Sequence, residues 1–107
     1  KAGNLVFIAG QVARDKGGQL VGKGDIEAQA RQVYANLEAA VRAAGGKKED
    51  LVATTTYLVD REHIPAARRV REQFYGPNPP TSTLLLVSGL AQPEFLIEVE
   101  GIAVLGE

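Results

Sequence analysis

Apolar residues follow two different periods along this chain. Between residues 25 and 44, and again between 63 and 75, they recur every three to four positions, which predicts two amphipathic helices. Shorter runs rich in β-branched and aromatic residues predict strands, and they span residues 5–9, 51–60, 81–87 and 94–104. The pattern therefore indicates a protein with both helices and strands.

Capping and turn residues set the expected limits of these elements. Asp25 is a good N-cap for the first helix, Gly45 and Gly46 end it, and Pro65 fits only the first turn of the second. The Asp-Lys-Gly-Gly turn at 15–18 predicts a return strand at 19–21, while it stays open whether 11–14 continues the first strand. The predicted order is ββαβαββ.

Two helices and several strands predict an α+β fold, with both helices packed on one face of a mixed sheet. The run at 81–87 (TSTLLLV) is apolar on both of its faces, yet no helix is left to cover the second face. We therefore expect other subunits to cover it. Neither repeats nor a change in composition divides the chain, so we expect a single domain over residues 1–107.

Composition narrows the function classes. The 107 residues include 12 basic and 13 acidic ones, and the net charge of −1 argues against a nucleic-acid partner. Without Cys and with His63 as the one histidine, we expect no metal site. Since there is no long apolar run and no signal-peptide pattern, we expect a cytoplasmic protein without a membrane partner. Met is absent even at position 1, and we expect the N-terminal strand to be truncated.

Two motifs have a simpler explanation than catalysis. Residues 17–24 nearly match the phosphate loop GxxxxGK[ST], but Gly24 replaces the hydroxyl residue that would hold magnesium, so a turn is favoured. Arg68, Arg69 and Arg71 follow one another on the second helix. A solvated helix face explains them, and anion binding by Arg68 or Arg71 is the alternative.

A pair of carboxylates is harder to explain. Glu98 and Glu100 lie on the same face of the last predicted strand, and Ile97 and Val99 lie on the other. If the acidic face meets solvent, both acids are ordinary surface residues. If it meets another subunit, at least one carboxylate is partly desolvated and suited to general acid or base chemistry. The pattern alone leaves both interpretations open.

Several segments together resemble a known family. Residues 1–11 (KAGNLVFIAGQ) resemble the opening signature of the Rid (YjgF) family, the reactive intermediate deaminases, also known as L-PSP endoribonuclease-like proteins. The DLVATTTYLVD run at 50–60, the PTST run at 80–83 and the IEVEGIAV run at 97–104 resemble its central and closing strands. The match follows the whole chain in order.

The resemblance implies a chorismate-mutase-like fold and a homotrimer with a ligand cleft at each subunit interface. It implies hydrolysis of enamines and imines, such as 2-iminobutanoate, to 2-keto acids and ammonia, without a cofactor. The partner would be a small 2-imino or 2-keto acid. By this resemblance Glu98 positions the attacking water, and the ligand-binding positions are Phe7, Ala9, Gly10, Arg68, Thr81, Ser82 and Thr83.

One departure affects the expected chemistry. The deaminases carry an arginine that clamps the substrate carboxylate, and Thr81 stands in its place here. The serine before the early glycine is replaced by Ala9, and the helix position that often carries Asn is Arg68. Two functions therefore stand: an imine hydrolase that uses Glu98 and a relocated clamp, and a non-catalytic ligand-binding or sensor trimer. Ribonuclease or translation-inhibitor activity, the older label of the family, is disfavoured by the near-neutral charge.

Overall fold

The computed structural model describes residues 2–106, so the ends of the predicted domain, Lys1 and Glu107, lie outside the described residues. Two short 3-10 turns, Lys48–Asp50 and Arg61–His63, precede the second strand and the second helix. The main elements in chain order are β1 (Leu5–Gln11), α1 (Ile26–Ala43), β2 (Leu51–Leu58), α2 (Ile64–Tyr75), β3 (Thr81–Leu86) and β4 (Ile97–Val104).

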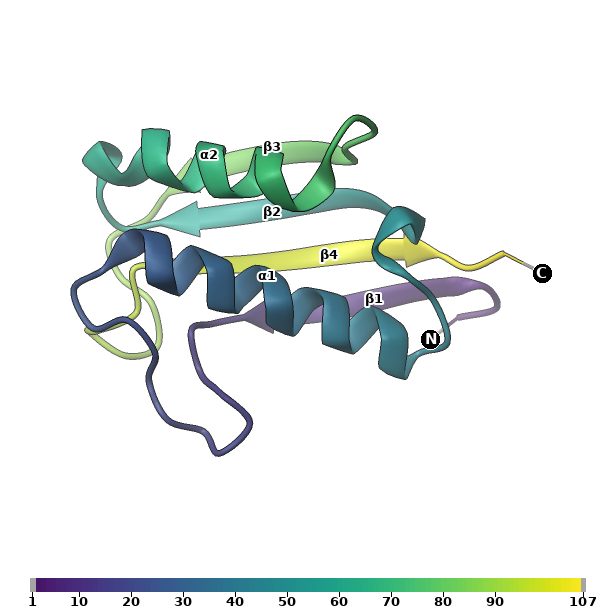
Figure 1. Cartoon of the computed structure of the whole chain (residues 1–107), viewed down its shortest axis with the longest axis horizontal. Coiled ribbons are helices and arrows are strands. Elements are labelled where there is room, and N and C mark those ends of the chain that lie inside the picture. The colour runs from purple at the N-terminus through teal and green to yellow at the C-terminus, as the bar shows by residue number, and fades with distance from the viewer. Residues whose placement is uncertain (1, 107) are drawn as a thin grey trace.

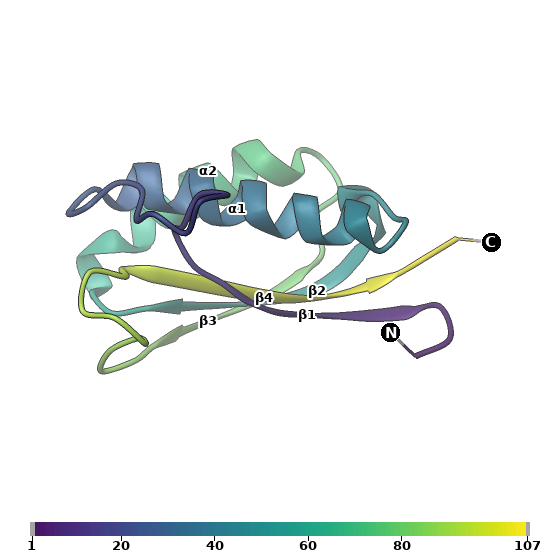
Figure 2. The same cartoon turned by 90° about the horizontal axis from the view of Figure 1, so that it is seen from below.

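The four strands form one mixed sheet in the order β1-β4-β2-β3. The strand β4 is antiparallel to both β1 and β2, whereas β3 is parallel to β2 and forms one edge of the sheet. Figure 1 shows α1 lying over β4 and β1, and α2 over β2 and β3. Figure 2 shows both helices on the same side of the sheet, as predicted, with the opposite side uncovered by any helix.

The core lies between the helices and the sheet because each element has one apolar face. In α1 the residues Val33, Leu37 and Val41 recur at helical spacing and are fully buried. The Asp25 side chain accepts a hydrogen bond from the Ala28 N–H at 3.1 Å and caps the helix as predicted. Gly45, with φ of +95°, lies just after the helix end in the left-handed conformation that glycine favours.

The predicted strand at 19–21 is absent from the structure, and the order is βαβαββ rather than ββαβαββ. Only an isolated bridge between Arg14 and Leu20 remains of the hairpin. The side-chain amide of Asn36 donates to the carbonyls of Val12 and Arg14, both at 2.9 Å. These bonds attach the segment after β1 to α1, so it leaves the sheet and cannot extend the β1 ladder.

The last strand begins at Ile97 instead of residue 94. Gln29 of α1 is fully buried, and its side chain accepts from the Leu96 N–H at 2.9 Å and donates to the Glu94 carbonyl at 2.9 Å. These bonds draw residues 94–96 toward the helix layer and bury Phe95 outside the strand. The strand at 51–60 likewise ends at Leu58, and the strand at 81–87 ends at Leu86.

Candidate active site

The two carboxylates of β4 lie on the uncovered face of the sheet. Along this strand buried and half-buried residues alternate, with Ile97 and Val99 fully buried under the helices. Glu98 and Glu100 are half-buried on the opposite face. The prediction that the two acids share a face is therefore confirmed, and that face is the one without helices.

The carboxylate of Glu98 lies against the main chain of β1. The strand register shifts between Ile8 and Gln11, so that Ala9 and Gly10 form a β-bulge. A Cβ atom built on Gly10 would lie only 2.0 Å from Oε2 of Glu98. Only glycine leaves room for the carboxylate at this point, which places Ala9, Gly10 and Glu98 in one small region.

Glu100 differs from Glu98 in its hydrogen bonding. The Tyr57 hydroxyl on the neighbouring strand donates to Oε1 of Glu100 at 2.8 Å. This hydrogen bond, with lesser contributions from desolvation and from the charges of Glu100 and Glu98, raises the pKa of Tyr57. Within residues 2–106, no protein group donates a hydrogen bond to Glu98. The Glu98 carboxylate therefore keeps its acceptor sites available for a water or a ligand.

The start of β3 carries three exposed hydroxyl residues, Thr81, Ser82 and Thr83. The Thr81 hydroxyl donates to the Val52 carbonyl at 3.1 Å, so its proton is used within the sheet. The Ser82 hydroxyl accepts from Nη1 of Arg71 at 3.3 Å. The segment 81–83 therefore contacts α2 through Arg71. Arg68, which the resemblance implies as a ligand-binding residue, does not make this contact.

The predicted site residues form separate groups within one chain. Phe7 and Thr81 lie on opposite edge strands of the sheet. Glu98 on β4 is level with Leu85 on β3, because both residues pair with Tyr57 on β2 between them. Thr81 lies four residues before Leu85 along β3 and two strand spacings from β4, which puts it about 16 Å from Glu98. Arg68 is exposed on α2. A small ligand in contact with both Glu98 and the Thr81 segment would need these from two different copies of the chain.

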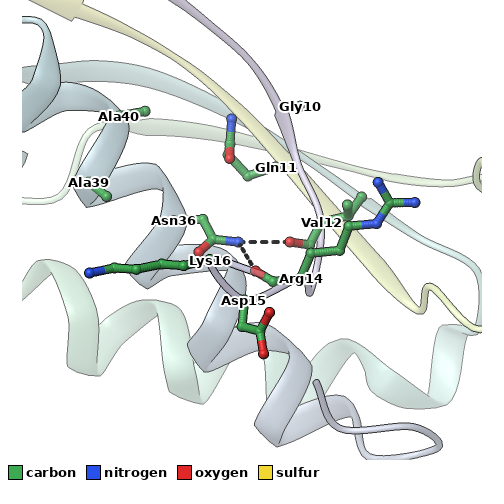
Figure 3. Close-up of a pocket in the computed structure, with 9 residues that line it drawn as sticks. All are labelled: Gly10, Gln11, Val12, Arg14, Asp15, Lys16, Asn36, Ala39 and Ala40. Atoms are coloured by element: carbon green, nitrogen blue, oxygen red, sulfur yellow. Dashed lines mark hydrogen bonds between the residues drawn. The ribbon is translucent and has the colours of Figure 1, made fainter. Parts of the chain in front are cut away.

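A groove of about 450 Å³ lies between the end of β1, the loop after it and α1 (Figure 3). Figure 3 shows the Asn36 amide between the carbonyls of Val12 and Arg14. Its Oδ1 accepts from the Gln32 side chain at 2.8 Å, and the Asp15 carboxylate accepts from two loop amides. Because these polar groups already have partners, the groove is better explained as the contact between loop and helix.

The near match to the phosphate loop at 17–24 is better explained as a turn. The Asp15 carboxylate accepts from the Gly17 and Gln19 N–H groups at 2.9 Å each, which occupies amides that a phosphate would need and supports the turn at 15–18.

His63 is half-buried, and its Nδ1 has no hydrogen-bond partner among the described residues. Residues 2–106 contain no group of three His, Asp or Glu side chains placed to hold a metal ion. No helix among them is long and apolar enough to span a membrane.

Of the residues in this region, Tyr57 was not singled out from the sequence, and Arg71 was named only beside Arg68 as an alternative for anion binding. The position of Tyr57 beside the carboxylates depends on the pairing of β2 with β4. Arg71 was one member of an arginine cluster, and its contact with Ser82 depends on how α2 packs over β3. The local sequence carries no signal for either contact.

Comparison with known proteins identifies the family. The family named endoribonuclease L-PSP matches residues 1–105. The chain belongs to this family, also called Rid or YjgF. A RutC family protein of Pyrococcus horikoshii is 41% identical over 104 residues, which cover 96% of this chain and 81% of that protein.

Solved structures of Rid-family proteins have the same fold. The Rid family protein YyfB of Yersinia pestis, described as of unknown function, is 39% identical with a TM-score of 0.87; the match covers 96% of this chain and 80% of that one. A putative endoribonuclease of Thermotoga maritima is 30% identical with a TM-score of 0.92, covering 100% and 84%. The resemblance seen in the sequence is confirmed at the level of family and fold.

Proposed function

We propose that this Rid-family protein is a homotrimeric hydrolase that converts small enamines or imines to 2-keto acids and ammonia. The observation that carries the proposal is the Glu98 carboxylate, held over Gly10 on the uncovered sheet face with its acceptor sites available. Such a carboxylate can bind and deprotonate a water molecule. Its neighbour Glu100 is engaged by Tyr57 and is less suited to that role.

The reaction needs only water and the substrate. As the water oxygen attacks the imine carbon, Glu98 accepts one of its protons and the C=N electron pair moves to nitrogen. Glu98 then gives that proton to the nitrogen, which makes a neutral amino alcohol. Glu98 next takes the hydroxyl proton and passes it to the same nitrogen as the C–N bond breaks, so the nitrogen leaves as ammonia and the carbonyl of the 2-keto acid forms. General base catalysis of this kind contributes roughly 10²–10⁴-fold in rate.

The uncovered face supports the assembly part of the proposal. Its exposed apolar side chains include Phe7 (62% exposed) on β1, Leu85 (47%) on β3 and Val52 (44%) beside a bulge of β2. Several exposed apolar side chains on a sheet face that no helix covers are typical of a subunit contact. Two further copies of the chain would cover this face and bring a second β3 toward Glu98.

A non-catalytic ligand-binding trimer is the second candidate. Thr81 replaces the clamping arginine, and its hydroxyl already donates to Val52, so position 81 offers no charged contact to a carboxylate. RNA hydrolysis has less support, because the net charge is −1 and two of the three tyrosines, Tyr34 and Tyr75, are buried in the core.

A coupled assay tests the proposal. A threonine dehydratase generates 2-iminobutanoate, a trapping reagent reports the imine that survives, and the protein is expected to speed its disappearance. Glu98→Gln should lower that activity at least about 10²-fold, and the matched variant Glu100→Gln should lower it much less. Wild-type protein without activity, or equal losses in the two variants, would favour the ligand-binding candidate.

Assembly is tested separately. Sedimentation velocity should give a trimer for the wild-type chain. Leu85→Glu places a charge on the uncovered face and should give monomers, with activity lost in parallel because the cleft needs two copies. Gln73→Glu, on the exposed side of α2, is the control and should stay trimeric. A monomeric wild-type chain that remains active would contradict the intersubunit cleft.

A further inference from the structure

The three arginines of α2 have different electrostatic partners. The guanidinium of Arg69 lies 3.1 Å from a carboxylate oxygen of Glu27, which also pairs with Arg31 at 2.7 Å. Arg68 is exposed and forms no ion pair with any of residues 2–106. Arg71 is half-buried, and within the same residues it also has no carboxylate partner.

Arg71 is held in place by a neutral group instead. Its Nη1 donates to the Ser82 hydroxyl at 3.3 Å across the gap between α2 and the edge strand β3. A guanidinium has five N–H donors in a planar fork, and this contact uses one. A charge that has lost part of its hydration is stabilised by an opposite charge. A half-buried arginine whose side-chain hydrogen bond within residues 2–106 goes to a hydroxyl is therefore suited to an external anion.

We propose that Arg71, positioned by Ser82 at the edge of β3, binds the carboxylate of the ligand. This inference rests on the proposed function and assigns the missing clamp to α2. The segment around Ser82 is exposed on an edge strand, where a ligand from solvent can reach it. A planar carboxylate fits the guanidinium fork through two parallel hydrogen bonds.

The proposal distinguishes Arg71 from Arg68, which the family resemblance placed in the site. Arg68 is exposed, so its attraction for an anion is weakened by water and salt. The half-buried Arg71 acts in a lower dielectric and has its position fixed by a hydrogen bond. The affinity for a ligand carboxylate should therefore depend more on Arg71 than on Arg68.

Calorimetric titration of the full chain with 2-oxobutanoate, the product of the proposed reaction, tests this assignment. Arg71→Gln should weaken binding about tenfold or more, because it removes charge-assisted hydrogen bonds. Arg69→Gln is the matched control, since Arg69 is already paired with Glu27, and it should bind within about twofold of wild type. The uncharged analogue 2-oxobutanamide should bind wild type and Arg71→Gln alike.

Further variants separate binding from folding and from catalysis. If Arg71→Gln lowers the melting temperature, Arg71→Lys shows whether the loss of binding is only a loss of stability. Lysine keeps the positive charge but lacks the planar guanidinium group, and Arg71→Lys should still weaken 2-oxobutanoate binding several-fold. Imine hydrolysis is measured on the same variants in the coupled assay. Arg71-dependent binding without any imine hydrolysis would therefore end the proposed enzyme function and leave this inference standing.

Three results would overturn the assignment of the carboxylate to Arg71. The first is equal weakening by Arg71→Gln and Arg69→Gln, which would indicate a general charge effect. The second is loss of binding in Arg68→Gln with Arg71→Gln unaffected. The third is a wild-type chain that does not bind 2-oxobutanoate, or that binds the amide equally well.

Discussion

Substituting Gly10 by Ala should separate catalysis from stability more cleanly than any other single change. A Cβ at this position would lie 2.0 Å from Oε2, 2.6 Å from Cδ and 2.9 Å from Cγ of Glu98. Ordinary contact distances are about 3.5 Å, so the carboxylate must move by about 1.5 Å. The Glu98 side chain is flexible and faces the uncovered side of the sheet, and it can yield without displacing the main chain.

The expected effect on activity is large and the effect on stability small. A displacement of about 1 Å in a reacting group can cost about 10²-fold in rate, or roughly 3 kcal/mol of transition-state stabilisation. Gly10 does not have a positive φ, so alanine fits its backbone conformation. The substitution should leave the free energy of unfolding unchanged or raise it by up to about 1 kcal/mol, because alanine restricts the unfolded chain.

The assay is imine disappearance in the coupled system, with urea unfolding measured on the same samples. Gly89→Ala is the control, because Gly89 has no positive φ and a Cβ there would meet nothing within 4 Å. If Gly10→Ala is as active as Gly89→Ala, the position of Glu98 over Gly10 has no catalytic importance. If Gly10→Ala instead unfolds the protein, the argument that only the side chain yields is wrong.

Three other perturbations test the core and the cleft. Gln29→Leu removes three hydrogen bonds to main-chain groups, and should lower the free energy of unfolding in urea by about 3–5 kcal/mol. Burial raises the pKa of Tyr34 from 10.0 to about 12, so the unfolded chain loses this proton first as pH rises. The Tyr34 hydroxyl should therefore lower the free energy of unfolding by about 2 kcal/mol between pH 10 and 12, and Tyr34→Phe should remove that part of the fall. Thr81→Arg places a guanidinium group at the position where the family's deaminases carry the carboxylate-binding arginine. This variant should raise the affinity for 2-oxobutanoate about tenfold in calorimetry.

Matched variants check each of these three expectations. Gln73→Leu, at an exposed position of α2, should change the free energy of unfolding by no more than about 0.5 kcal/mol; a loss equal to that of Gln29→Leu would refute the role of the buried bonds. An unchanged pH dependence in Tyr34→Phe would assign the alkaline loss to other groups. Thr81→Lys supplies charge without the fork, and an equal gain from Lys and Arg would exclude a bidentate contact.

The sequence by itself determined the local features of this protein. The Asp25 cap, the Gly45 helix end and the alternation that puts Glu98 and Glu100 opposite Ile97 and Val99 all depend on neighbouring residues. Local φ and ψ preferences and side-chain periods fix such features. The motifs also identified the Rid family, because they follow the whole chain in order.

The tertiary structure alone decided which distant groups meet. The hairpin at 19–21 failed because the Asn36 amide, more than 20 residues away, binds the segment after β1. The contacts of Glu98 with Gly10, Tyr57 with Glu100 and Arg71 with Ser82 depend on strand register and on how α2 packs. Register is set by the burial of whole strands and helices against one another, so no local pattern around a single residue could predict these pairs.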